Sequence, residues 1–243
     1  MEDPSHRENF LKDVALLSQK QKVVLVHGGG KEITRELDWR GIKATFVNGL
    51  RLTDDPTMQV VEEVLGKVNQ QIVQLFSELG VRAEGYSGKS DHLLRAKPIP
   101  QLGRAGKPDV VNIAVFGRIL AKRTLPVFYP VAEDAAGGSL NVNADDFAHA
   151  LALACRAHRL IYLTDSGGVL DKEGKQIARI DKRIAENLIE AGVISGGMIV
   201  KARASVDAVE KGVGSVDITK NIKYLISTDA AASAVTSFSA QVD

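Results

Sequence analysis

Short apolar runs alternate along the chain with longer stretches in which apolar side chains recur every three or four residues. Residues 23–27 form a run that is almost wholly apolar, and a run of this length is typical of a buried strand. Residues 56–79 instead carry an apolar face at helical spacing, preceded by Asp55-Pro56 and followed by Gly80. They therefore predict a long amphipathic helix with a defined start and end.

The same pattern predicts further elements on both sides of these two. Residues 81–120 are rich in glycine and proline and are expected to form strands and loops. Residues 221–243 are rich in serine, alanine and threonine and are expected to form a poorly ordered tail. Helices are predicted at about 5–20, 31–40, 146–158, 181–191 and 198–211, and strands at 44–47, 126–131, 160–165 and 215–218.

Strands that alternate with helices predict an α/β fold. We expect a three-layer sandwich whose central, mostly parallel sheet is covered on both faces. Ligands bind such sheets at the carboxyl ends of the strands. Three glycine-containing loops follow predicted strands or precede predicted helices, at residues 28–30, 166–168 and 195–197. Asp145 also lies just before a predicted helix. Their common position indicates one ligand-binding edge.

Length, charge and cysteine content limit the kinds of protein that this chain can be. The 243 residues suffice for one large domain or two small lobes. The net charge of +1 gives no reason to expect nucleic acid or a membrane surface as partner. Cys155 is the only cysteine, so no disulfide framework is expected, and it is expected to be a buried apolar residue. The acidic first residues do not look like a signal peptide, and we expect a cytoplasmic protein.

The most suggestive local chemistry lies in Gly28-Gly29-Gly30, between the predicted strand and the helix at 31–40. Glycines let the backbone approach a ligand closely, and a helix N-terminus favours an anion. The triplet matches neither the P-loop nor the dinucleotide pattern. Taken alone, it is equally compatible with a strand-to-helix turn that needs small residues.

Five segments stand out in order along the chain: 27–30 (HGGG), 48–54 (NGLRLTD), 141–145 (NVNAD), 163–171 (LTDSGGVLD) and 196–201 (GGMIVK). With these segments the chain resembles the amino acid kinase family over residues 2–218. Within that family, Asn48-Gly49-Leu50-Arg51 is most similar to the acetylglutamate kinases.

The resemblance implies transfer of the ATP γ-phosphoryl group to the side-chain carboxylate of N-acetyl-L-glutamate, a step of arginine biosynthesis. Arg51 would bind the α-carboxylate, Asn141 would bind the same substrate, and Gly28, Gly29 and Gly30 would hold the acceptor and the phosphoryl group. Lys201 would neutralise phosphate charge and Asp145 would orient a catalytic lysine.

For the nucleotide, the resemblance implies two further segments: Thr164, Asp165, Ser166, Gly167, Gly168 and Val169, and the loop with Gly196 and Gly197. Mg²⁺ would accompany ATP and be held mainly by its oxygens, with no protein metal ligands. The family also implies a homo-oligomer. Residues 1–218 would form one kinase domain, with a substrate-binding lobe at about 1–135, a nucleotide-binding lobe at about 136–218 and a divergent segment at 219–243.

Simpler interpretations stay open for individual residues. Arg51 could be a surface charge, Lys201 a solvated helix lysine, and Asp145 the N-cap of the helix at 146–158. His27 is expected to be a structural hydrogen-bonding residue, because a carboxylate acceptor needs no base near neutral pH.

Three parts of the chain are expected to differ from the family. Residues 1–4 would align just after the family's opening Lys-x-Gly-Gly strand and loop, so the chain would lack that element. Phe116 to Val127 would leave too little chain for the family's helical crossover. The end lacks the family's glycine-rich closing strand. Two alternatives follow: a catalytically impaired ligand-binding or regulatory protein of this fold, and a kinase of an aminoadipate derivative in lysine biosynthesis.

Overall fold

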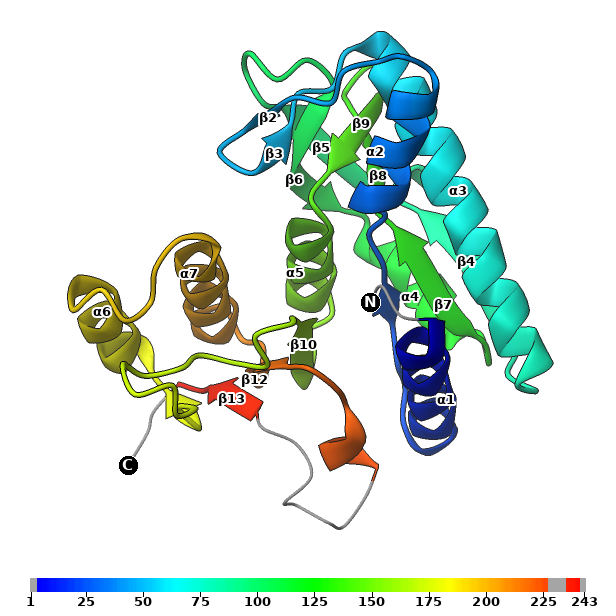
Figure 1. The fold of residues 1–243 in the computed structure, drawn as a ribbon. Helices are drawn as coiled ribbons and strands as arrows, with labels where there is room; N and C mark the ends of the chain where they lie inside the picture. Colours follow the sequence, from blue (N-terminus) through cyan, green and yellow to red (C-terminus); the bar gives the residue numbers. More distant parts are fainter. Residues whose placement is uncertain (1–3, 227–234, 241–243) are drawn as a thin grey trace. The chain divides into compact units, whose positions relative to one another are not determined.

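The computed structural model describes residues 4–226 and 235–240, which belong to two units. Unit 2 comprises Ser18–Ala150, and unit 1 comprises Met1–Leu17 together with Leu151–Asp243. Helix α1 (Pro4–Lys20) begins in unit 1, and helix α5 (Ala144–Ala154) runs from unit 2 into unit 1 (Figure 1).

Unit 2 contains a parallel sheet in the order β1 (Leu25–Val26), β7 (Leu125–Tyr129) and β4 (Ala83–Ser87). The predicted strand at 23–27 is therefore present in shorter form. The central strand β7 is buried, with Val127 and Phe128 fully shielded from solvent. Residues 83–87, within the segment 81–120 that was expected to form strands and loops, make up β4.

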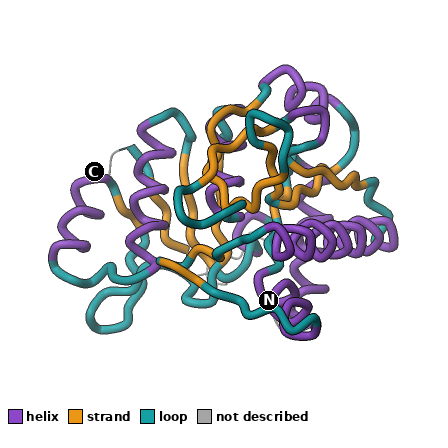
Figure 2. Tube along the Cα trace, turned by 90° about the horizontal axis from the view of Figure 1, so that it is seen from above, coloured by secondary structure: helices purple, strands orange, loops and turns teal. Residues whose placement is uncertain are grey.

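Four further strands of unit 2 close into a small barrel: β5 (Leu94–Pro98), β6 (Ala105–Val111), β9 (Ser139–Val142) and β8 (Val131–Glu133). A short 3₁₀ turn, η1 (Ser90–His92), precedes β5. The barrel strands lie toward the viewer in Figure 2. A Cβ added at Gly106 would lie 2.9 Å from Cβ of Leu140, so the barrel interior has no space for a side chain there.

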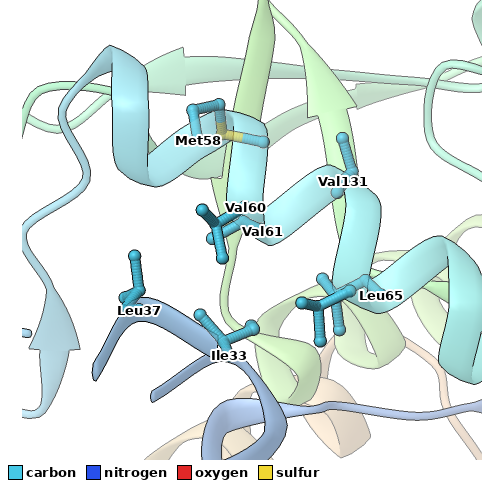
Figure 3. Close-up of a cluster of buried hydrophobic side chains, with 8 residues drawn as sticks. Ile33, Leu37, Met58, Val60, Val61, Leu65 and Val131 are labelled. Carbon is cyan, nitrogen blue, oxygen red and sulfur yellow. The ribbon is translucent and has the colours of Figure 1, made fainter. Parts of the chain in front are cut away.

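Helices α2 (Gly30–Trp39) and α3 (Asp55–Glu78) pack through a cluster of buried apolar side chains. Ile33 and Leu37 of α2 face Val61 and Leu65 of α3 in Figure 3. Asp54 caps α3 by accepting the backbone N–H of Thr57 at 2.9 Å, and the predicted start signal Asp55-Pro56 forms the first two helical residues. This packing holds the N-terminus of α2 beside the sheet.

A β-hairpin joins the two helices. Strands β2 (Phe46–Val47) and β3 (Leu50–Arg51) pair antiparallel around Asn48-Gly49, whose φ angles are 50° and 81°. An Asn-Gly pair suits such a turn because both residues tolerate positive φ. The hairpin places Arg51 at the end of a strand, where its side chain turns inward.

One expectation for unit 2 is wrong. Residues 113–121 form helix α4 (Ile113–Ala121), so the segment between Phe116 and Val127 does carry a helix. Asn112 caps it by accepting the N–H of Val115 at 3.2 Å. The segment is apolar on most sides and contains Gly117, which hides the helical period.

Unit 1 contains a four-stranded sheet in the order β10 (Arg159–Leu163), β12 (Ser215–Thr219), β13 (Val235–Phe238) and β11 (Arg179–Ile180). Strands β10 and β12 are parallel over five residue pairs. Helices α6 (Lys182–Glu190) and α7 (Gly197–Glu210) confirm the predicted helices at 181–191 and 198–211.

The expectation of a poorly ordered tail is wrong where the structure describes it. Strand β13 pairs with β12 and β11, and its Thr236 and Phe238 are buried. A 3₁₀ turn, η2 (Lys223–Leu225), is also anchored, since the hydroxyl of Tyr224 donates to Asp217 at 2.6 Å. Residues 227–234 and 241–243 of the predicted tail lie outside the described residues.

The α/β class and its parallel strand pairing are confirmed. The parallel strands lie in a three-stranded sheet of unit 2 and in part of the four-stranded sheet of unit 1. Among the residues that the structure describes, no helix has the length and apolar character needed to cross a bilayer.

Candidate functional site

The glycine triplet links β1 to α2 in unit 2. Gly29 is the N-cap of α2, and its φ of −174° is open to any residue. A Cβ on Gly29 would lie 2.8 Å from Cδ2 of the buried Leu65. Gly29 is therefore required by close packing on α3, not by backbone conformation.

Helix α2 begins at Gly30, which is exposed. The first intrahelical hydrogen bond runs from the N–H of Ile33 to the carbonyl of Gly29 at 2.8 Å. Backbone N–H groups ahead of that bond have no acceptor within the helix and carry its positive dipole end. The triplet thus has the geometry of an anion site.

His27 fixes the entry to this loop. Its Nδ1 lies 2.9 Å from the carbonyl oxygen of Gly28, and its Nε2 lies 3.1 Å from the amide nitrogen of Asn69. Burial lowers the pKa of His27 below its usual value, which favours the neutral ring. Its contacts are those of a structural hydrogen-bonding residue, as the sequence predicted.

Arg51 lies against the first turn of α2. Its Nη2 donates to the carbonyl oxygen of Gly30 at 2.9 Å and to Oγ1 of Thr34 at 2.8 Å. The guanidinium carbon lies 4.6 Å from the centre of the Phe46 ring. Only 7% of Arg51 is exposed, so the alternative of a surface charge is wrong.

The other terminal nitrogen of Arg51 is distinctive. Nη1 is buried and has no hydrogen-bond partner within the described part of the chain. Burial also lowers the pKa of the guanidinium, although arginine remains charged. A buried donor of this kind costs free energy unless an acceptor reaches it. Carboxylate and phosphate oxygens match a guanidinium best.

Asn141, on β9, is connected to the same cluster. Its Nδ2 donates to Oγ1 of Thr53 at 3.1 Å, and that hydroxyl donates to the backbone carbonyl of Arg51 at 2.9 Å. Thr53 is fully buried. The hydrogen bonds therefore join Asn141, Arg51 and the N-terminus of α2 into one polar group within unit 2.

The start of α5 shows which residue caps this helix. The side chain of Asn143, not of Asp145, is the cap: its Oδ1 accepts the N–H groups of Asp145 at 2.8 Å and Asp146 at 3.3 Å. Asp145 is half-buried in the first helical turn. The interpretation of Asp145 as the N-cap of this helix is therefore wrong.

In unit 1, residues 164–169 form a tight turn after β10. The N–H of Gly167 donates to the carbonyl of Thr164 at 3.1 Å, and Gly167 and Gly168 have φ angles of 76° and 148°. Asp165 and Ser166 are exposed at its tip, whereas Gly167, Gly168 and Val169 are buried.

Hydrogen bonds from Thr236 of strand β13 and from Gln176 hold this turn in place. Oγ1 of Thr236 accepts the N–H of Val169 at 2.9 Å and donates to the carbonyl of Ile177 at 2.7 Å. Nε2 of Gln176 donates to the carbonyl of Gly167 at 2.8 Å. Sequence reasoning missed both residues, and the contact to Thr236 could not be predicted locally because it spans 67 positions of the chain.

Gly196 and Gly197 open helix α7. Gly196 is its N-cap with a φ of 55°, and Gly197 is the first helical residue, with no heavy atom within 4 Å of an added Cβ. Lys201 follows one turn later and is half-buried, with Nζ 5.2 Å from the centre of the Tyr162 ring. The contact argues against a freely solvated lysine.

The structure thus groups the candidate residues within each unit. Unit 2 holds Gly28, Gly29, Gly30, Arg51, Asn141 and Asp145, and unit 1 holds Thr164–Val169, Gly196, Gly197 and Lys201. Sequence reasoning missed Asn69, although a polar residue four positions after Leu65 on an apolar helical face was a usable signal. The described residues include no group of three or more His, Cys, Asp or Glu side chains arranged to hold a metal ion.

Comparison with known proteins identifies relatives. A model of the "Amino acid kinase family" matches residues 1–220. The chain is 42% identical over 220 residues to an acetylglutamate kinase of Campylobacter curvus, covering 89% of this chain and 78% of the relative. It is 43% identical over 234 residues to an acetylglutamate kinase of Methylobacterium nodulans, and the match covers 90% of this chain and 77% of that relative.

A solved structure of N-acetylglutamate synthase from Neisseria gonorrhoeae, complexed with coenzyme A and N-acetyl-glutamate, superposes with a TM-score of 0.85. It is 21% identical, and the match covers 99% of this chain and 57% of that one. At this identity the likeness concerns the fold alone.

Proposed function

The chain belongs to the amino acid kinase family, and from that premise we propose that it is an ATP-dependent kinase of N-acetyl-L-glutamate. Its product would be N-acetyl-L-glutamyl 5-phosphate, an intermediate of arginine biosynthesis. The acetylglutamate kinases that share about two fifths of its residues support this substrate. The structural observation that carries it is the buried Nη1 of Arg51 beside a helix N-terminus, for which the described residues supply no acceptor.

The reaction balances without a protein base. One oxygen of the ionised side-chain carboxylate attacks the γ-phosphorus of ATP, the bond from that phosphorus to the bridging oxygen breaks, and ADP leaves with the electron pair. A carboxylate carries no proton near neutral pH. The protein's contribution is therefore positioning and charge stabilisation.

On the acceptor side, Nη1 of Arg51 takes an oxygen of the substrate's α-carboxylate. Nη2 stays bonded to Gly30 and Thr34, so the guanidinium is held in place before the substrate arrives. Asn141 binds the same substrate, and the amides of Gly28, Gly29 and Gly30 receive the acceptor carboxylate and the phosphoryl group.

On the nucleotide side, we assign Thr164–Val169, Gly196 and Gly197 to ATP. The N-terminus of α7 offers amides to phosphate oxygens, and Lys201, one turn along the same helix, offers a positive charge. Family membership supports ATP as donor. Mg²⁺ would be held mainly by phosphate oxygens and would neutralise their charge. Asp145 orients a catalytic lysine in this proposal.

The assignment of about 1–135 as the substrate-binding lobe and about 136–218 as the nucleotide-binding lobe remains part of the proposal, with 219–243 as a divergent segment. A homo-oligomer and a cytoplasmic location also remain predictions. The oligomer is tested by light scattering of the purified chain.

Trapping the acyl phosphate tests the function. The chain is incubated with ATP, Mg²⁺, N-acetyl-L-glutamate and hydroxylamine, and the hydroxamate is identified by mass spectrometry. We expect product from the wild-type chain and a loss of at least about 10²-fold in Lys201→Ala. A wild-type signal no higher than that of Lys201→Ala would contradict the proposal.

The same assay separates the alternatives. Supplying N-acetyl-L-glutamate and an N-blocked aminoadipate together shows which acceptor is used, and preferential use of the aminoadipate would favour lysine biosynthesis. Calorimetry that detects acetylglutamate or ATP binding without turnover would favour a ligand-binding protein of this fold. N-acetyl-L-aspartate, one methylene shorter, serves as the matched acceptor control.

A further inference from the structure

Asn69, on helix α3, is a buried polar residue outside the roles proposed above. Only 4% of it is exposed. Its amide nitrogen Nδ2 donates to the carbonyl oxygen of Val127 at 2.9 Å and lies 3.1 Å from Nε2 of His27. A carbonyl oxygen can only accept, so the nitrogen of the amide must be the atom that faces Val127. That contact fixes which way the amide points.

Strand β4 packs closely against the other end of the amide. A Cβ on Gly85 would overlap Oδ1 of Asn69, so the oxygen fills the space left by the missing side chain. The two N–H bonds of Nδ2 are then committed to Val127 and His27.

The direction of these bonds determines the protonation of His27. Because Asn69 donates to Nε2, that ring nitrogen has no proton of its own. The proton is on Nδ1, which donates to the carbonyl oxygen of Gly28 at 2.9 Å. The lowered pKa of the half-buried ring is consistent with this neutral form.

The bond to Gly28 acts on the next residue. The peptide bonds of the described chain are trans, and in a trans peptide the C=O and N–H groups point in opposite directions. A ring that holds the Gly28 oxygen therefore aims the N–H of Gly29 away from His27. Gly29 is the N-cap of α2, where backbone N–H groups serve an anion.

We propose that Asn69 is a positioning residue that acts through His27: it selects the Nδ1-protonated ring, which holds the Gly28 carbonyl and so presents the Gly29 amide to the anionic acceptor or phosphoryl group. This inference rests on the proposed function for the identity of the anion. The hydrogen-bond chain itself, from Asn69 to His27 to Gly28, does not depend on it.

Nitrogen-15 NMR of the ligand-free wild-type chain tests the first half. The two ring nitrogens of His27 are assigned by comparison with a His27→Asn sample, and their shifts show which one carries the proton. We expect a neutral ring protonated on Nδ1. In Asn69→Asp, a carboxylate replaces the donor, and we expect both ring nitrogens to carry protons. A wild-type ring protonated on Nε2 would overturn the proposal.

Kinetics with an isosteric pair test the second half. The amide of His27→Asn places an N–H near the position of Nδ1, whereas that of His27→Gln places it near Nε2. We expect His27→Gln to raise KM for N-acetyl-L-glutamate about tenfold more than His27→Asn does, with KM for ATP alike in both. Equal KM values for the acceptor in the two variants would overturn the proposal.

The two failures are distinguishable. If the wild-type chain gives no turnover, the proposed function fails, and the ring protonation measured without ligand still decides whether Asn69 acts on His27 as stated. If turnover is normal and the ring is protonated on Nε2, the proposed function stands and the role of Asn69 does not.

Discussion

Nη2 of Arg51 donates a hydrogen bond to the carbonyl oxygen of Gly30 at 2.9 Å. The bond joins the end of a β-hairpin to the first residue of α2, so a guanidinium charge and the positive end of a helix dipole lie together. Hydrogen bonds to Gly30 and Thr34 and the contact with the Phe46 ring hold the guanidinium in this position. An anionic substrate would be attracted by both positive groups.

Arg51 should be needed for the acceptor and not for the nucleotide. Lysine keeps the charge but lacks the second terminal nitrogen, so Arg51→Lys cannot serve Gly30, Thr34 and a carboxylate at once. We expect KM for N-acetyl-L-glutamate to rise about 10- to 100-fold, which corresponds to one charge-assisted hydrogen bond, with KM for ATP unchanged. Arg35→Lys, at an exposed position of α2, is the matched control. Equal effects on both substrates would contradict this role.

Gly29 should tolerate no side chain, in contrast to its neighbour. In Gly29→Ala the new methyl group would press on Leu65, which is itself buried. We expect the free energy of unfolding to fall by about 1–3 kcal/mol. Gly30→Ala, which meets no heavy atom within 4 Å, should leave it nearly unchanged. Urea unfolding of the two variants measures the difference, and equal losses would disagree with the packing described.

Thr236 should control the turn at 167–169. Thr236→Val keeps the shape of the side chain but leaves the buried N–H of Val169 without its acceptor. We expect a loss of about 1–3 kcal/mol in unfolding free energy. Faster hydrogen exchange at the Val169 amide and a higher KM for ATP should accompany it. Thr236→Ser retains the hydroxyl and should keep this amide protected. Fast exchange in the serine variant would show that the hydroxyl of residue 236 does not hold the Val169 amide.

The pH dependence of stability should carry the signature of His27. Its pKa is lowered in the folded chain by burial, against opposing effects of the Gly28 hydrogen bond and of Glu32 on α2. Below its ordinary value of 6.5 the unfolded chain binds the proton that the folded chain does not, so stability falls as pH decreases through 6.5. Chemical unfolding across this range should show a flatter decline in His27→Asn. Parallel curves for the two proteins would mean that His27 titrates normally.

Local signals predicted most of the elements. The strand before the glycine triplet, the long helix that starts at Asp55 and the helices at 181–191 and 198–211 follow from short-range patterns, and the structure contains all of them. Helix α4 was missed because its residues are apolar on most sides, although its cap, Asn112, was visible in the sequence. Strand β13 was missed because its partners, β11 and β12, are set by tertiary pairing.

The glycine loops and the family resemblance predicted the candidate residues. They did not predict the contacts that hold those residues in place. Nothing local to Asn69 shows that its amide faces Val127 and His27, since those contacts cross 58 and 42 positions of the chain. The sequence suggested Asp145 as the cap of α5, whereas the structure shows Asn143 in that position. Asp and Asn are both common N-cap residues, so only the backbone geometry distinguishes them.

Oxygen-18 labelling tests the central claim most directly. N-acetyl-L-glutamate labelled in both side-chain carboxylate oxygens is incubated with ATP, Mg²⁺ and hydroxylamine, and the released phosphate is examined by phosphorus NMR. Attack of the carboxylate on the γ-phosphorus makes one labelled oxygen the bridge of the acyl phosphate. Hydroxylamine then displaces phosphate from the acyl carbon, and we predict that each phosphate carries one oxygen-18. Phosphate without the label would show that no acyl phosphate forms and would contradict the proposed reaction.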